Sequence, residues 1–325
     1  MNQTHNREIT EALEGEGTGV RFEPLSGGFT QAEKYVVTCQ TPEGPKQLFA
    51  KVVDAQNQLE SRVLDAEATH YQSLAQLRLT GRYFPGFHTY VRTEQTRALL
   101  IDYLPETTWG GPWTLENTQK LFDSISAIHA VDVPEGQKKR IRYTADSLMN
   151  YLYKESPNTL NDDDYARLFE HAWSSGKSHV VNSRGQQYFN GNAELYEEIK
   201  DCSARYDKRA GERIQIRDVN FNNIGVTADG VVFVDPAYLD IGNPASDMVG
   251  LGLNVLLVTP DDEEHLAVRQ FVKDKFIADN KFALARTIQS LLAVGTLEYG
   301  EVENPWMDYH QQMAETALRA WHDLI

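Results

Sequence analysis

The chain has 325 residues, a length that suggests two domains or one large fold with two lobes. Its 47 acidic and 31 basic residues give a formal charge of −16, which excludes a generally basic protein that coats nucleic acid. Two cysteines exclude a disulfide scaffold, and the longest apolar run, of about eight residues, is far shorter than the ~20 that a membrane span needs. With no apolar signal segment at the N-terminus, we expect a cytoplasmic protein without nucleic-acid or membrane partners.

The first hundred residues have the pattern of antiparallel strands with one helix. Four short apolar runs flanked by turn residues predict strands, at residues 35–39, 48–53, 89–92 and 98–103. A turn-forming segment at 41–45 makes the first two runs a hairpin, and apolar residues at helical spacing predict a helix over 58–77. After about residue 105 the pattern is mostly helical, except at 214–235.

Two glycines, Gly27 and Gly28, follow Ser26 and lie between β-type runs. Glycine allows backbone N–H groups to approach a bound group closely, for example a phosphate. Taken alone, a Gly-Gly pair is more often a structural turn.

Lys51 lies within an apolar strand and shares its face with Phe49 and Val53. A lysine on such a face is costly to bury unless an anion meets it, although an edge-strand lysine could simply point to solvent. Glu67, sixteen residues further on in the expected helix, could supply that anion, and Glu60 is a rival partner.

The strongest signal lies at 214–235, where Asp229 and Gly230 form a hairpin turn between two apolar runs. If these runs pair, Asn223 and Asp235 lie at the same open end of the hairpin. Their side-chain oxygens can then converge on one hard cation such as Mg²⁺, which prefers oxygen ligands.

Asp218 lies five residues before Asn223 and would therefore stand close to the same place. A carboxylate there can orient an attacking hydroxyl or accept its proton. Each motif alone has a structural explanation, but the whole series of glycines, lysine and acidic residues in this order is hard to obtain by chance.

With these motifs in this order, the sequence resembles the aminoglycoside phosphotransferase and choline kinase group, relatives of the protein kinases, over about residues 22–250. The resemblance implies an α+β, two-lobed, protein-kinase-like fold. Its N-terminal lobe, 1–104, would combine an antiparallel sheet with one helix and bind the nucleotide. The mostly helical lobe, 105–325, would carry the catalytic and substrate sites. The implied activity is transfer of phosphate from ATP to a small-molecule hydroxyl, with Mg²⁺.

The resemblance also implies roles in the first lobe. The loop that covers the phosphates corresponds to Ser26, Gly27 and Gly28. Lys51 is similar to the strand lysine that holds the α- and β-phosphates, and Glu67 to its partner. The segment 99–105, with Asp102 and Leu104, resembles the hinge whose backbone groups hold adenine.

In the second lobe, Asp218 corresponds to the catalytic aspartate, while Asn223 and Asp235 correspond to the metal-binding positions. Asp247 corresponds to an aspartate that braces the catalytic loop. The group usually has His-Gly before the catalytic aspartate, whereas this chain has Ile216 and Arg217, a form closer to that of protein kinases.

The sequence leaves two other functions open, that of a protein Ser/Thr kinase and that of a catalytically silent nucleotide-binding module. Only 12 positions separate Asp235 from Asp247, too few for the long activation segment of a protein kinase. Every group needed for metal and phosphate handling is present, which argues against the silent module.

The distribution of charge along the chain bears on the chemical class of the acceptor. Residues 1–104 hold 10 Lys/Arg and 13 Asp/Glu, a net −3, whereas residues 105–325 hold 21 and 34, a net −13. An acidic helical lobe favours a small cationic acceptor with a hydroxyl group, such as an aminoglycoside. Other acceptors stay open, namely choline, a sugar, a nucleoside and a homoserine-like metabolite. Transfer of a nucleotidyl group instead of a phosphoryl group also stays open. The helical part carries an insertion at about residues 140–205. Its many aromatic residues are expected mainly in the core.

Overall fold

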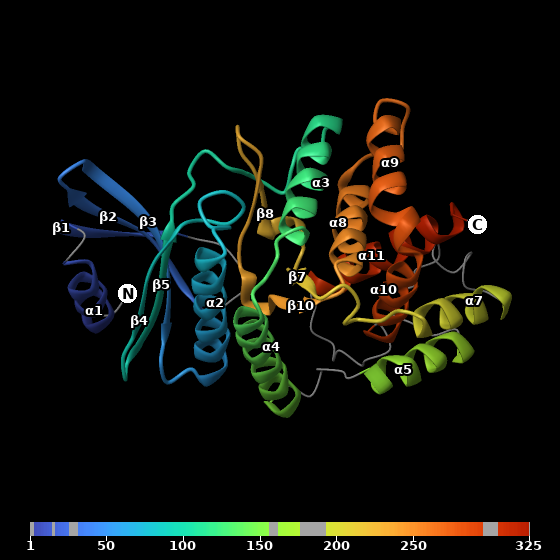
Figure 1. Cartoon of the computed structure of the whole chain (residues 1–325), viewed down its shortest axis with the longest axis horizontal. Coiled ribbons are helices and arrows are strands. Elements are labelled where there is room, and N and C mark those ends of the chain that lie inside the picture. The colour runs from blue at the N-terminus through green and yellow to red at the C-terminus, as the bar shows by residue number, and fades with distance from the viewer. Residues whose placement is uncertain are drawn as a thin grey trace.

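The computed structural model of the chain describes residues 3–14, 17–25, 32–155, 162–175, 193–294 and 305–324. Within these segments, the five longest strands gather in an N-terminal lobe and most helices in a C-terminal lobe (Figure 1). Helix α2 (Gln58–Gln76) lies where the two lobes meet, since it contacts the sheet on one side and α4 (Glu135–Glu155) on the other.

Five strands form an antiparallel sheet in the order β1-β2-β3-β5-β4. They are β1 (Thr18–Leu25), β2 (Glu33–Thr41), β3 (Gly44–Asp54), β4 (Phe87–Arg92) and β5 (Thr96–Asp102). The tight turn between β2 and β3 sets their register, because Thr41 pairs with Gly44 and the pairs then run in step to Lys34 opposite Lys51. The predicted hairpin is therefore confirmed.

Side chains of this sheet alternate between two faces. On one face Leu48 and Ala50 are fully buried, and they cluster with Ile9 and Leu13 of helix α1 (Gln3–Leu13). The sequence pattern predicts one helix in this lobe, and α1 is a second. Its apolar stripe is too narrow to stand out in a polar segment, and the exposed apolar face of the sheet decides that it packs there.

Helix α2 covers the other face. Asn57 caps it by accepting a hydrogen bond from the backbone N–H of Glu60 at 3.3 Å. Leu64, Tyr71 and Leu74 are buried against the sheet and the second lobe, and Glu67 is buried on the same helix. The expected helix over 58–77 is thus present with almost the predicted bounds.

The C-terminal lobe is built from helices. Besides α4 they are α3 (Leu115–His129), α5 (Asp162–Ser175), α7 (Ala193–Ala204), α8 (Ala245–Val258), α9 (Leu266–Val272), α10 (Lys281–Val294) and α11 (Pro305–His322). Helix α8 is mainly apolar, with Leu251, Leu253 and Val255 almost completely buried, because other helices and the loop that carries Asp218 surround it.

Short strands near the interface hold the site segments. β8 (Ile224–Val226) pairs with β9 (Val231–Phe233) and with β6 (Thr108–Trp109), and β7 (Arg213–Gln215) pairs with β10 (Asp240–Gly242). The β8–β9 hairpin is the one that Asp229 and Gly230 predict. Among the described residues, no helix is long and apolar enough to cross a membrane.

The aromatic residues of the insertion only partly follow the expectation of burial. Phe169, Trp173 and Tyr196 pack together between α5 and α7. Tyr143 is 77% exposed, because it lies on the outer side of α4. Tyr188 and Phe189 lie outside the described residues.

Candidate active site

Lys51 on β3 is the centre of an ion-pair cluster in which Lys51 and Glu67 are buried and Asp235 is partly exposed. Its Nζ donates to Glu67 Oε2 at 2.8 Å and to Asp235 Oδ1 at 2.7 Å. Lys51 is only 4% exposed and Glu67 only 2%. Of the two candidate partners, Glu67 therefore makes the pair with Lys51.

The charges in this cluster influence one another strongly. Burial opposes the charge of Lys51, but Glu67 and Asp235 outweigh burial and hold the pKa of Lys51 above its ordinary value. Burial also opposes the ionised form of Asp235, yet Lys51 keeps the pKa of Asp235 below its usual range. Burial, reinforced by Asp235, raises the pKa of Glu67 despite the lysine. One lysine thus serves two carboxylates, and the cluster can accept a further cation.

Asp235 is placed by the β8–β9 hairpin. The backbone N–H of Val234 donates to the carbonyl of Asn223 at 3.0 Å, which brings the open end of the hairpin together as predicted. Asp235 follows in a left-handed conformation, with φ 54° and ψ 54°. Such a conformation costs a residue with a side chain about 1–3 kcal/mol and is typical of functional sites.

Asp218 lies beside this hairpin, and two amides orient its carboxylate. Asn220 Nδ2 donates to Oδ1 at 2.7 Å, and Asn223 Nδ2 donates to Oδ2 at 3.0 Å. Burial, together with the charge of Asp235, raises the pKa of Asp218 although both amides lower it. The carboxylate is therefore a better proton acceptor than an ordinary surface aspartate.

Asp247 on α8 braces the loop that carries Asp218. Its carboxylate is fully buried and accepts hydrogen bonds from the backbone N–H of Ile216 at 2.6 Å and of Arg217 at 2.9 Å. His129, the last residue of α3, lies with Nε2 3.2 Å from Asp247 Oδ2. The brace implied for this aspartate is thus present in the geometry.

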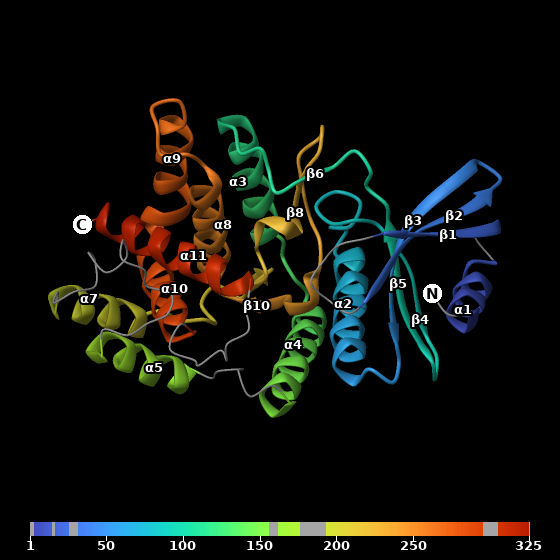
Figure 2. The ribbon, with the colours of Figure 1, turned by 180° about the vertical axis from the view of Figure 1, so that it is seen from behind.

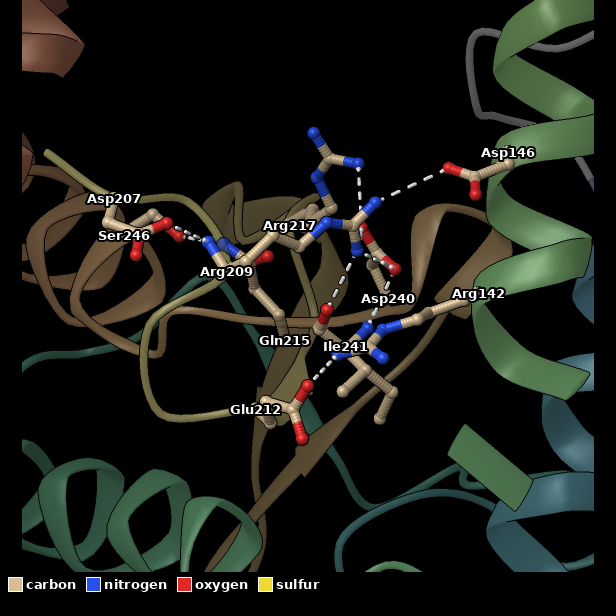
Figure 3. Close-up of polar contacts among 10 residues, drawn as sticks. All are labelled: Arg142, Asp146, Asp207, Arg209, Glu212, Gln215, Arg217, Asp240, Ile241 and Ser246. Atoms are coloured by element: carbon tan, nitrogen blue, oxygen red, sulfur yellow. Dashed lines mark hydrogen bonds and ion pairs between the residues drawn. The ribbon is translucent and has the colours of Figure 1, made fainter. Parts of the chain in front are cut away.

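Arg217 occupies the position where the resembling group has glycine. Its φ of 67° is left-handed, a conformation that glycine adopts without strain. Arg217 Nη1 lies 3.4 Å from Asp240 Oδ2, and Arg209 Nη1 lies 3.3 Å from both carboxylate oxygens of Asp240 (Figure 3). Asp240 on β10 is buried, so two arginines compensate its charge behind the loop that carries Asp218.

The C-terminal helix α11 also reaches the loop that carries Asp218, and it lies beside α8 in Figure 2. The ring of Tyr309 packs against Phe221 with centroids 6.1 Å apart, and its hydroxyl donates to Asn254 Oδ1 at 3.0 Å. Asn254 Nδ2 donates in turn to the carbonyl of Val219 at 3.2 Å. No local signal in the sequence indicates these contacts, because their partners are 35 or more residues apart in the chain.

The predicted hinge joins the lobes at the end of β5. Asp102 turns its carboxylate toward the start of β4, where it accepts from the backbone N–H of Gly86 at 2.8 Å and meets His88 Nε2 at 2.6 Å. These hydrogen bonds from His88 and Gly86 lower the pKa of Asp102. Leu104 lines the cavity described next, whereas Ser26, Gly27 and Gly28 lie outside the described residues.

A cavity of about 710 Å³ collects the predicted site residues from both lobes. Those that line it are Lys51, Glu67, Asp102, Leu104, Asp218, Asn223 and Asp235. The lining also includes Lys34, which sequence reasoning missed. The hairpin register could have found this residue, since a two-residue turn after Thr41 places Lys34 directly opposite Lys51.

The donor set suits Mg²⁺ bound together with phosphates. Asn223 Nδ2 faces Asp218, so its Oδ1 is left to face elsewhere as a possible ligand, and Asp235 lines the same cavity. Among the described residues, no group of three or more His, Cys, Asp or Glu side chains could hold a metal ion alone. Two protein ligands completed by phosphate oxygens and water are typical of Mg²⁺, which rarely has an all-protein cage.

Comparisons of the sequence with protein-family models and with curated proteins gave no match. Solved structures match over nearly the whole chain. The crystal structure of spectinomycin phosphotransferase in complex with ADP and spectinomycin has a TM-score of 0.54 at 10% identity and covers 98% of each chain.

Two further structures match at 12% identity with TM-scores of 0.52. Ethanolamine kinase from Plasmodium vivax covers 98% of this chain and 87% of its own. Choline kinase from Cryptosporidium parvum covers 98% and 95%. At these identities the likeness establishes the fold, so the predicted two-lobed, kinase-like α+β fold is confirmed.

Proposed function

We propose that the protein is a Mg²⁺-dependent phosphotransferase that moves the terminal phosphate of ATP to a hydroxyl group of a small molecule. The observation that carries this proposal is that Lys51 with Glu67, Asn223 with Asp235, and Asp218 all line one cavity. The fold shared with a spectinomycin phosphotransferase and with choline and ethanolamine kinases supports the same class of reaction. We assign nucleotide binding to lobe 1–104 and catalysis with acceptor binding to lobe 105–325.

The residues divide the work in this reaction. Phosphoryl transfer needs positioning and charge neutralisation more than covalent help from the protein. Lys51, oriented by Glu67, and the loop with Ser26, Gly27 and Gly28 would hold the phosphates. The hinge at Asp102 and Leu104 would hold adenine. Asn223 and Asp235 would hold Mg²⁺, which when bound neutralises charge on the triphosphate.

Asp218 would orient the acceptor hydroxyl and accept its proton. Its raised pKa, which burial causes, suits this task, and the amides of Asn220 and Asn223 keep the carboxylate in one orientation. The negative charge of lobe 105–325 supports a cationic acceptor.

A protein kinase fits the structure less well. After Asp235 the chain enters a 3₁₀ turn (Pro236–Tyr238), then β10, and then α8 from Ala245, so all of this segment has a structural place. A peptide-binding platform therefore has no room between Asp235 and Asp247. The cytoplasm stays the predicted compartment of the protein. Its two cysteines, Cys39 and Cys202, are free, buried thiols.

The test is ATP turnover against a broad panel of hydroxyl-bearing amines, aminoglycosides, sugars and nucleosides, with release of ADP and phosphorylated product measured together. We expect a phosphorylated small molecule, and no product with Asp218→Asn at the same protein concentration. ATP binding without turnover for the whole panel and for peptide substrates would instead support the silent module, and phosphorylated peptide would support the protein kinase. Nucleotidylated product would move the reaction to another class.

A further inference from the structure

A second lysine, Lys34, lies beside Lys51 in the sheet. In the antiparallel pairing of β2 with β3, Lys34 is the direct partner of Lys51. Directly opposed residues share one face of a sheet, with Cβ atoms about 4.5–5.5 Å apart. Both lysines line the cavity between the lobes, and among the described residues that line it they are its only basic side chains.

Two cations directly opposite each other on adjacent strands destabilise a sheet. Burial and the charge of Lys51 both lower the pKa of Lys34, and the carboxylates of Asp235, Glu67 and Glu60 only partly offset them. A further anion held between the two ammonium groups would offset the repulsion between them.

Lys51 has limited capacity for such an anion. Its ammonium group has three N–H donors, and Glu67 and Asp235 each accept one of them. One donor is left for a ligand. A ligand with several anionic oxygens would need a second source of positive charge in the cavity.

Lys34 lies where that charge is needed. It pairs with Leu25, the last residue of β1, on its other side, so it sits between Leu25 and Lys51 across three strands. Leu25 also lines the cavity.

We propose that Lys34 binds the polyphosphate chain of the nucleotide as a second cation beside Lys51. This inference rests on the proposed function, because it takes a nucleoside triphosphate as the ligand of the cavity. It adds a phosphate-binding residue on β2 to the lysine on β3. The pair then brackets the phosphates from two adjacent strands.

The experiment is calorimetric titration of ATP, ADP and AMP, each with Mg²⁺, into the full chain and its variants. Lys34→Met removes the charge, and Lys34→Arg keeps it. The matched control is Arg21→Met, which removes an exposed positive charge from β1, outside the cavity. Thermal unfolding of each protein without nucleotide checks the fold.

We expect Lys34→Met to weaken binding of ATP by roughly 10–100-fold, the loss typical of a charge-assisted hydrogen bond, and that of AMP by less than about threefold. Lys34→Arg should stay within about tenfold of wild type, and Arg21→Met should match wild type. Without nucleotide, the melting temperature of Lys34→Met should stay close to that of wild type, which shows that the variant keeps its fold.

Two results would overturn the assignment of Lys34 and leave the proposed function intact. In one, wild type binds ATP and Lys34→Met binds it equally well. In the other, Lys34→Met loses affinity for AMP as much as for ATP, which indicates a general disturbance of the cavity. If wild type binds no nucleotide at all, the proposed function fails, and the assignment of Lys34 fails with it.

Discussion

In the N-terminal lobe, Lys51 is held by charge, since two carboxylates accept its hydrogen bonds at 2.8 and 2.7 Å. In the C-terminal lobe, Asp218 is held by neutral amides, and its loop is held by backbone N–H groups that donate to Asp247. A residue held by charge changes its contacts when a charged ligand arrives, whereas a residue held by amides keeps its geometry. The first arrangement suits binding of Mg-ATP, and the second suits a group that must aim at one atom.

Removing Asp235 is the most severe test of the arrangement in which two carboxylates hold Lys51. We expect Asp235→Ala to abolish Mg²⁺-dependent ATP binding and turnover, because it removes a proposed metal ligand and one of the two partners of Lys51. Calorimetry with and without Mg²⁺ measures the effect. Unchanged affinity and activity would show that the metal assignment is wrong.

Asp218→Asn tests the amide-held side. The substitution keeps the shape of the side chain but removes the proton acceptor, so we expect turnover to fall by about 10²–10⁴-fold while ATP binding stays nearly intact. The measurement pairs steady-state turnover with nucleotide titration. Binding and turnover lost together, with a lowered melting temperature, would make Asp218 a structural residue.

Asp247→Ala tests the brace under the catalytic loop. It leaves the backbone N–H groups of Ile216 and Arg217 buried without their acceptor, so we expect the free energy of unfolding to fall by about 2–4 kcal/mol. Urea unfolding measures this loss. Asp146→Ala is the control, because that carboxylate is exposed and makes only a 3.5 Å ion pair with Arg209. Equal stability of both variants would contradict the brace.

His70 offers a neutral contact between α2 and the segment after Asp235, with Nδ1 2.8 Å from the carbonyl of Pro236. Burial lowers the pKa of His70 to about 4, below the ordinary value near 6.5 that it regains in the unfolded chain. The unfolded state therefore binds more protons between these values, and stability should fall as pH drops from about 6.5 to about 4, by at most roughly 3 kcal/mol. When urea unfolding is measured across this pH range, the free energy of unfolding should change less with pH in His70→Gln than in wild type. An unchanged pH dependence would contradict the assignment of this effect to His70.

Arg217→Gly should have the smallest effect. Glycine relieves the left-handed strain but loses the contact with Asp240, so we expect the free energy of unfolding to change by less than about 1 kcal/mol. Arg217→Ala keeps the strain and loses the same contact, so it should be less stable than the glycine variant. An alanine variant as stable as the glycine variant would show that φ at this position carries no cost.

Much of the site could be predicted from local patterns, because turn chemistry and strand periodicity act over a few residues. The Asp229-Gly230 turn brings Asn223 and Asp235 together in any fold that keeps the hairpin. The choice between Glu60 and Glu67 could not be predicted in this way. Seven residues are almost two helical turns, so both lie on nearly the same face of α2, and only the placement of the helix on the sheet selects Glu67.

The sequence by itself determined the hairpins, the helix α2 and the identity of the charged groups, since these depend on neighbours in the chain. Tertiary structure decided which groups meet. Packing against the sheet made α1 part of the core, and the pairing of β7 with β10 placed Asp240 behind the catalytic loop, within reach of Arg217. Contacts of this kind join segments distant in sequence, and burial of the shared core, which no local pattern encodes, decides them.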